Sequence, residues 1–364
     1  MKWVMFTGKA IVAGIVSAVI WNLILGAFFN IPLAYHHDPS LGWMPKPYSR
    51  QYSTDEGRAL CLYNEFGFRG ETIGARQPRE WRIVAIGDSF TEAHQVDNAQ
   101  TFVSRLQNLL RPKARAGTRV RVLNAGRDNT TPAYFVHSAA RYKQIFQPDW
   151  VVILIHDGNW LKIADPEREI YYRRAGDGFA IEQHWLWETM SPRRKLWAQW
   201  PGRDQPFFAT LANRLKQMRA TGPKNDAPST AGAGAAPSAG PASPVLDAAT
   251  MQRAVSWTVE QLKAKYPKLV LVHMPDGSTE RNNLVPPTPT EQWLGEACRL
   301  YQVPLIAMRE RIKRDYARSG KPPLGFSNTA PWQGHPNAHG HELIAAALAE
   351  FFAPKLPQTE LAQP

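Results

Sequence analysis

The chain has 364 residues, of which 44% are hydrophobic and 20% are charged, so it is long enough for one large globular domain with additional segments. The formal net charge of +12 suits an acidic partner, such as anionic lipid headgroups or an anionic polysaccharide. The sequence has no zinc-finger or helix-turn-helix pattern and no long basic run, which argues against a nucleic-acid partner.

The first element along the chain is an apolar run at residues 10–30, which no charged residue interrupts. A helix of about 20 such residues can cross a membrane. Lys2 and Lys9 precede the run, which predicts that residues 1–9 form a cytoplasmic tip and that the rest of the chain lies outside. A cleaved signal peptide is the alternative, but residues 28–32 read Phe-Phe-Asn-Ile-Pro, a poor cleavage site. We therefore expect an uncleaved, single-pass transmembrane helix.

Residues 31–80 are rich in Pro, Gly, Tyr and Arg and lack long periodicity, so we expect an extended lead-in. Short apolar runs then alternate with helical periodicity up to residue 353, and residues 354–364 are expected to form a tail. Strands are predicted at residues 81–86, 120–123, 150–155, 269–273 and 303–306, and helices at 102–110, 133–145, 291–301 and 339–352. This alternation predicts an α/β fold with a parallel five-stranded sheet that binds its ligand at the carboxyl ends of the strands.

Two segments interrupt the alternating pattern. Residues 161–219 contain four tryptophans and a hairpin signal, in which residues 170–174 and 179–181 flank Ala-Gly-Asp-Gly. We expect a cap-like insertion, whose tryptophans stack on sugars, lie at a membrane interface or pack over the sheet. Residues 221–246 are mostly Ala, Gly, Pro, Ser and Thr, a composition that predicts a flexible loop.

Residues of types that often act in catalysis are expected at the carboxyl edge of the predicted sheet. Ser89 ends a Gly-Asp-Ser turn between the first strand and a helix, a position that exposes its hydroxyl. A serine hydroxyl needs a base, and His335 precedes the last helix, where it can return to the same edge. Gly126 closes the second strand and Asn159 follows the third. Ser89, Gly126 and Asn159 are therefore predicted to form an oxyanion hole.

Four short blocks resemble those of the SGNH/GDSL hydrolase family. They are Gly-Asp-Ser-Phe-Thr-Glu at residues 87–92, Asn-Ala-Gly at 124–126, Gly-Asn at 158–159 and His-Pro-Asn at 335–337. They occur in the family order, and the domain that they define runs from residue 81 to residue 353. The resemblance implies a flavodoxin-like three-layer α/β/α sandwich with Ser89 as nucleophile and His335 as its base.

Two further motifs, Asp-Pro-Ser-Leu-Gly-Trp at residues 38–43 and the segment 64–70, resemble the lead-in of membrane-anchored bacterial members. This resemblance implies an anchor in the inner membrane, with the catalytic domain in the periplasm or outside the cell. It also implies an acylated carbohydrate as substrate, carrying O-acetyl groups on an envelope or exported polysaccharide. Water as the acceptor would make the protein an esterase, and a sugar hydroxyl would make it an O-acyltransferase. No cofactor is expected.

The sequence departs from the family at two positions. The aspartate that the family usually has three residues before the histidine is replaced by Trp332, and the residue after Asn159 is Trp160. Asp157, Asp128 or a backbone carbonyl could hold the second nitrogen of His335. We expect a serine–histidine dyad held by a backbone carbonyl, with Asp157 as the next choice.

These departures leave open a non-catalytic glycan-binding or assembly protein on a degenerate hydrolase scaffold. A metal site is not expected, because His335, His339 and His341 have no carboxylate at useful spacing. Cys61 and Cys298 form either one disulfide or two buried thiols.

Overall fold

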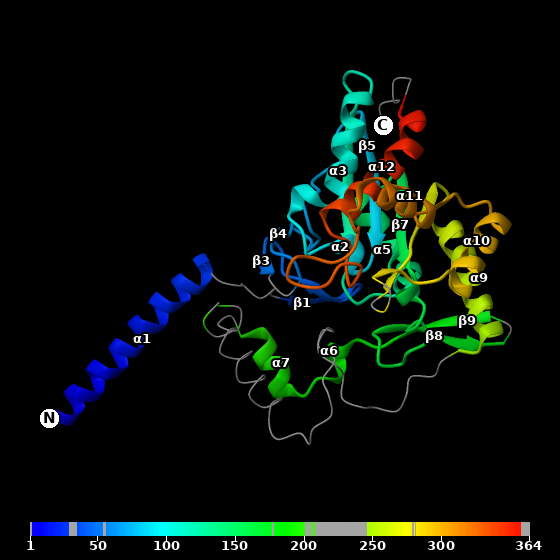
Figure 1. Cartoon of the computed structure of the whole chain (residues 1–364). Helices are drawn as coiled ribbons and strands as arrows, with labels where there is room; N and C mark the ends of the chain where they lie inside the picture. The colour runs from blue at the N-terminus through cyan, green and yellow to red at the C-terminus, as the bar shows by residue number, and fades with distance from the viewer. Residues whose placement is uncertain are drawn as a thin grey trace.

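The computed structural model describes residues 2–28, 35–53, 56–176, 178–200, 205, 207, 246–278, 280 and 282–357. Its centre is a parallel five-stranded sheet with the strand order β13-β10-β7-β5-β6 (Figure 1). The strands are β5 (Glu80–Gly87), β6 (Arg119–Gly126), β7 (Trp150–His156), β10 (Leu269–Met274) and β13 (Leu305–Ala307). The five predicted strands are confirmed.

Helices cover both faces of the sheet because successive strand residues point to opposite sides. One hydrophobic core joins the sheet to α4 (Pro132–His137), α5 (Ala139–Phe146), α9 (Ala248–Lys265) and α10 (Pro289–Leu300). The other core joins it to α3 (Phe102–Leu110), α11 (Arg309–Ser319) and α12 (Ala338–Phe352). The prediction of a three-layer α/β/α sandwich is therefore confirmed.

The sequence pattern did not predict α9 and α11. Helix α9 buries Thr250, Ala254 and Thr258, small or polar residues that dilute its apolar stripe. Helix α11 is highly charged, and Ile312 is the one aliphatic side chain among its buried residues. In α11 the buried face is too weakly apolar to be recognised by periodicity, and in α9 the two threonines interrupt the pattern of Val255, Val259 and Leu262.

The segment expected as an extended lead-in contains two antiparallel hairpins. Strand β1 (Tyr35–Asp38) pairs with β2 (Gly42–Pro45), and β3 (Arg50–Ser53) pairs with β4 (Ala59–Leu62). Leu41, Met44 and Phe68 from this region are buried in the same core as α4 and α5. The expectation of a simple linker is corrected by this packing, since the segment forms part of the folded domain.

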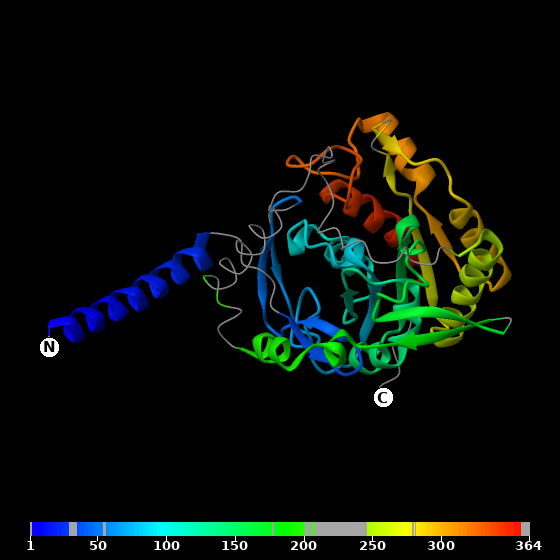
Figure 2. The same ribbon diagram turned by 90° about the horizontal axis from the view of Figure 1, so that it is seen from below.

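The insertion begins with the predicted hairpin, formed by β8 (Ile170–Ala175) and β9 (Gly178–Gln183). Figures 1 and 2 show this hairpin beside α9, and Phe179 lies 6.0 Å from Trp257 between ring centroids. The helices α6 (Leu186–Thr189) and α7 (Pro192–Gln199) follow. A short pair, β11 (Gly277–Ser278) and β12 (Asn283–Leu284), extends the loop after β10. The loop expected at 221–246 lies outside the described residues except at position 246, as does 358–364 of the tail.

Helix α1 (Lys2–Phe28) projects away from the sandwich in both views (Figures 1 and 2). Its Thr7–Leu25 stretch is long and apolar enough to cross a membrane, and none of it is buried. By length and composition a signal sequence has the same properties. Elsewhere, Cys61 and Cys298 are free, buried thiols, so the disulfide alternative is not observed.

Candidate active site

Ser89 is the first residue of α2 (Ser89–Glu92), which begins directly after β5. Asp88 caps this helix, because its Oδ1 accepts a hydrogen bond from the Phe90 N–H at 3.0 Å. Gly87 is required before it, since a Cβ there would lie 2.1 Å from Thr91 Oγ1. The Gly-Asp-Ser sequence thus makes a tight strand-to-helix turn that places the serine at the carboxyl edge of the sheet.

His335 lies on the loop before α12, and the structure brings it to Ser89. The His335 Nε2 atom is 2.9 Å from Ser89 Oγ. The loop is fixed on both sides of the histidine, because the Gly325 N–H donates to the His335 carbonyl and Asn337 caps α12. The predicted pairing of serine and histidine is therefore present in the geometry.

Glu56 contacts the other side of the imidazole. Its Oε2 lies 2.5 Å from His335 Nδ1, and its Oε1 accepts the His335 backbone N–H at 2.7 Å. Glu56 belongs to the loop between β3 and β4, where Gly57 N–H donates to Asn328 Oδ1 at 2.8 Å and so ties the loop to the histidine segment. Burial opposes ionisation of Glu56, but the hydrogen bonds and charge of His335 outweigh it and lower the pKa of the carboxyl. An ionised Glu56 can fix the tautomer of the imidazole.

This contact corrects the expectation for the third member. Neither a backbone carbonyl nor Asp157 holds His335 Nδ1. Asp157 instead accepts hydrogen bonds from Thr288 Oγ1 at 2.7 Å and contacts His273 Nε2 at 3.2 Å. Asp128 lies on the loop after β6, where its N–H donates to Glu92 at 2.5 Å. The residue at the family's aspartate position, Trp332, is buried and has a left-handed backbone with φ 66°.

The three predicted oxyanion donors differ in their availability. The Gly126 N–H donates to Asn124 Oδ1 at 2.8 Å, and Gly126 packs beneath α2, so this amide is already used within the protein. Asn159 Nδ2 donates to Asp88 Oδ2 at 2.7 Å, which places the amide next to the Gly-Asp-Ser turn. The N–H groups of Ser89 and Asn129 form no hydrogen bond to any residue in the described ranges.

A second histidine, which sequence reasoning missed, contacts the Gly-Asp-Ser turn. His156 Nε2 is 2.8 Å from Asp88 Oδ2, and its Nδ1 is 2.8 Å from Asp276 Oδ1. The ring stacks on Phe90 with centroids 4.2 Å apart. Burial lowers the pKa of His156, but the two carboxylates outweigh it and raise the pKa to about 10. An imidazolium between two carboxylates therefore anchors Asp88.

Arg69 supports the turn from the other end of α2. Its side chain is buried and donates to the carbonyls of Glu92, Ala93 and Val96. These carbonyls follow the last turn of the short helix and need donors, which a guanidinium fork can supply together. The arginine of the Gly-Phe-Arg-Gly motif is thus a positioning residue for the serine-bearing turn.

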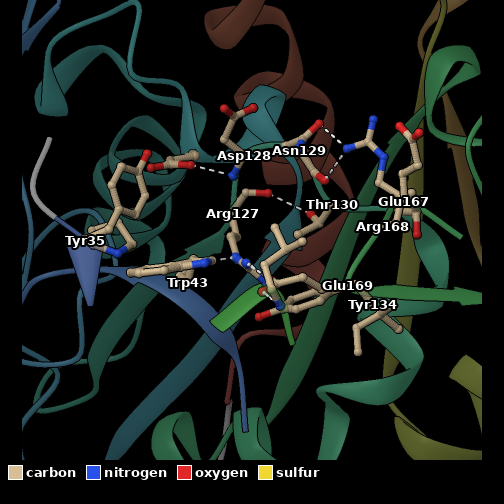
Figure 3. Close-up of a pocket in the computed structure, with 15 residues that line it drawn as sticks. Tyr35, Trp43, Arg127, Asp128, Asn129, Thr130, Tyr134, Glu167, Arg168 and Glu169 are labelled. Atoms are coloured by element: carbon tan, nitrogen blue, oxygen red, sulfur yellow. Dashed lines mark hydrogen bonds and ion pairs between the residues drawn. The ribbon is translucent and has the colours of Figure 1, made fainter. Parts of the chain in front are cut away.

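A cavity of about 270 Å³ opens beside this site (Figure 3). Its lining includes Glu92 of α2, Asn129 and Thr130 of the loop after β6, and Tyr35 and Trp43 of the first hairpin. Thr130 O also accepts a weak hydrogen bond from Asn159 Nδ2 at 3.5 Å. The cavity is therefore adjacent to the residues around Ser89. Among the described residues, no group of three or more His, Cys, Asp or Glu could hold a metal.

Comparisons with known proteins give matches among solved structures only. No family model and no curated protein matches the chain. The chain is similar to the structure of TesA, with 14% identity, coverage of 76% of this chain and 99% of that chain, and a TM-score of 0.39. A lipase/acylhydrolase from Enterococcus faecalis matches at 14% identity, with coverage of 77% and 100% and a TM-score of 0.41. A two-domain esterase active on acetylated mannans matches at 13% identity, with coverage of 78% and 52% and a TM-score of 0.40.

Proposed function

We propose that this chain is a serine ester hydrolase with Ser89 as nucleophile, His335 as general base and Glu56 as the carboxylate that orients it. The observation that carries the proposal is the continuous line of contacts from Glu56 through His335 to Ser89, at 2.5 and 2.9 Å. These are the distances at which a base can take a proton from a nucleophile. A scaffold that only binds glycans has no need for such an arrangement, which disfavours the non-catalytic alternative.

In the proposed reaction, His335 Nε2 takes the Ser89 proton as the serine oxygen attacks the ester carbonyl. The tetrahedral intermediate collapses when the imidazolium returns the proton to the leaving alkoxide, which departs as an alcohol. Water, deprotonated by His335, then attacks the acyl-enzyme and releases the acid. Glu56 stays ionised throughout and stabilises the imidazolium, the role of a triad carboxylate.

We place the oxyanion against the N–H groups of Ser89 and Asn129 and the Asn159 amide. Asn129 has a left-handed backbone with φ 62° in the loop after β6, a conformation that glycine or asparagine adopts most readily. It takes the part expected of Gly126, whose N–H is occupied. Asp88 and its ion pair with His156 hold the Asn159 amide at the site before substrate binds.

For the substrate, we propose O-acyl groups, such as O-acetyl, on an envelope or exported polysaccharide. Two features support a role at a membrane surface: the apolar helix α1 and the net charge of +12. With helix α1 as an inner-membrane anchor, the active site faces the periplasm or the exterior. A transferase would use the same residues and differ only in taking a sugar hydroxyl in place of water.

Hydrolysis of 4-nitrophenyl acetate by the full-length protein in detergent tests the proposal. The wild type is expected to release nitrophenol, and the Ser89→Ala variant to lose this activity while keeping its circular dichroism spectrum and melting temperature. Ser191→Ala, an exposed serine at the start of α7, is the matched control and should retain full activity. Equal turnover by Ser89→Ala and wild type would rule out Ser89 as the nucleophile.

A further inference from the structure

The cavity beside Ser89 combines aromatic and charged groups in a way that points to a particular kind of sugar. Glu92, which lines it, is three residues after Ser89 on α2, about one helical turn away. The lining also includes Trp43 and Tyr35, from a hairpin outside the sandwich, and Leu186 from the insertion. A group bound here would therefore be within reach of the nucleophile while contacting parts of the chain that the sandwich itself does not provide.

The size and aromatic lining of the cavity suit a single sugar ring. Its volume of about 270 Å³ is slightly below the range of about 300–1,000 Å³ that is typical of ligand pockets, so it suits a small group. Trp43 is held in place because its carbonyl accepts a hydrogen bond from Arg127 Nε at 3.0 Å and its ring packs edge-on against Trp187 at 5.6 Å. A rigid indole offers an apolar face to the C–H side of a pyranose at little entropic cost.

The two arginines of the cavity are already neutralised. Arg127 pairs with Glu169 at 2.9 Å, and its guanidinium lies over the Tyr134 ring at 4.6 Å from the centroid (Figure 3). Arg168 lies 3.8 Å from Asp165 and donates to the Asn129 carbonyl. Arg127 therefore has its own acidic partner, and the charge of Arg168 is offset by Asp165, Asp128 and Glu167 together.

Carboxylates outnumber guanidiniums in the cavity lining, with Glu92, Asp128, Glu167 and Glu169 against Arg127 and Arg168. Asp128 and Glu167 are exposed, and neither forms an ion pair with any residue in the described part of the chain. The charge of Asp128 acts on the cavity: burial raises the pKa of Glu92, and Asp128 adds to this rise while His94 opposes it. The local potential is therefore negative, although the chain as a whole carries a charge of +12.

We propose that this cavity binds one pyranose ring of the acylated substrate and selects a ring without a carboxylate, namely a neutral sugar or an amino sugar. The inference rests on the proposed function and specifies its substrate. Ring hydroxyls or an ammonium group donate hydrogen bonds to Asp128 and Glu167, while Trp43 packs on the apolar face. A uronic acid would bring a third carboxylate to this rim and is disfavoured by like-charge repulsion.

The test measures kcat/KM for two methyl glycosides that carry an O-acetyl group at the same position, one of glucosamine and one of glucuronic acid. Each value is divided by the kcat/KM of the same enzyme for 4-nitrophenyl acetate. We expect the kcat/KM of wild type to be higher for the glucosamine ester by at least about fivefold, because the uronate is repelled by the carboxylates of this partly exposed site. Asp128→Asn should narrow this preference, because it removes one repelling charge. Trp43→Ala should lower the relative kcat/KM of both sugar esters.

Glu310→Gln, an exposed carboxylate on α11, and Trp200→Ala, an aromatic residue of the insertion that does not line the cavity, are the matched controls. Both should leave the sugar preference as in wild type. Equal rates for the two sugars, a preference for the uronate, or an unchanged sugar ratio in Asp128→Asn would overturn the inference. Loss of 4-nitrophenyl acetate hydrolysis by wild type would instead overturn the proposed function, so the two failures are distinguishable.

Discussion

Glu56 and His335 are 279 residues apart in the sequence, yet their side chains meet at 2.5 Å. The carboxylate comes from a hairpin loop that precedes the sandwich, and the imidazole comes from the loop before its last helix. The hairpin thus completes the arrangement around Ser89, and the proposed catalytic machinery depends on a segment outside the strands and helices of the sandwich.

The Glu56→Gln variant tests this dependence. Glutamine keeps the shape of the side chain but cannot stabilise an imidazolium, and it can favour the wrong tautomer. We expect kcat to fall by about ten-thousandfold, the size of a lost triad carboxylate, with little change in KM. Glu71→Gln, an exposed residue in the same region, is the control and should behave as wild type. A Glu56→Gln enzyme that keeps most of its rate would show that His335 works without this carboxylate.

The oxyanion site predicts a second kinetic effect. Asn159→Ala removes a donor that acts on the intermediate more than on the bound ester. We expect kcat to fall by about a hundredfold to a thousandfold, with KM nearly unchanged. Asn283→Ala, at an exposed position of β12, should have no such effect. If KM rises while kcat stays constant, the Asn159 amide binds the ground state rather than the intermediate.

The ion pair of His156 with Asp88 and Asp276 predicts a pH-dependent contribution to stability. The pKa of His156 is raised to about 10 in the folded protein, above the ordinary value of 6.5. Its contribution is therefore fully present below about pH 6.5 and is lost as the pH rises through 10.

His156→Gln leaves two buried or partly buried carboxylates unpaired and should reduce the free energy of unfolding by about 3 kcal/mol at pH 7. The deficit relative to wild type should shrink as the pH approaches 10, measured by urea unfolding at a series of pH values. His184→Gln, a histidine after β9, is the control. A deficit that is constant from pH 6 to pH 10 would mean that His156 contributes by packing alone.

Membrane topology gives another test. Lys2 and Lys9 flank the amino-terminal side of the apolar helix, so the positive-inside tendency leaves the folded domain outside the cytoplasm. An alkaline phosphatase fused after Pro364, which is active only outside the cytoplasm, should be active and membrane-bound. Activity found in a soluble fraction would indicate that the apolar helix is cleaved as a signal, and an inactive fusion would contradict the orientation.

Much of the sandwich could be predicted from the sequence, because its strands are buried on both faces and appear as short apolar runs. The Gly-Asp-Ser turn predicted the place of Ser89, and the loop before the last helix predicted the place of His335. Both predictions depend on local pattern and on the rule that strand ends share one edge.

Glu56 and Asn129 could not be predicted in this way. The partner of His335 is set by tertiary packing of the β3–β4 loop, and an isolated Glu-Gly pair in a polar segment carries no periodic signal. At Asn129 the proposed oxyanion donor is a backbone N–H, which the residue type does not reveal. The one signal in the sequence is that asparagine adopts a left-handed backbone more readily than most residues. Gly126 was chosen because it is a glycine, but close packing against α2 explains that glycine.

The most direct test of the account is the covalent state of Ser89. Full-length protein is treated with a fluorophosphonate probe, and the modified residue is identified by mass spectrometry of the proteolysed chain. The proposed triad predicts stoichiometric labelling of Ser89, no labelling of Ser89→Ala, and labelling that is slowed by about three to four orders of magnitude in Glu56→Gln. Absence of labelling on wild-type Ser89, or labelling of Glu56→Gln at the wild-type rate, would contradict the assignment of an activated serine held by Glu56 and His335.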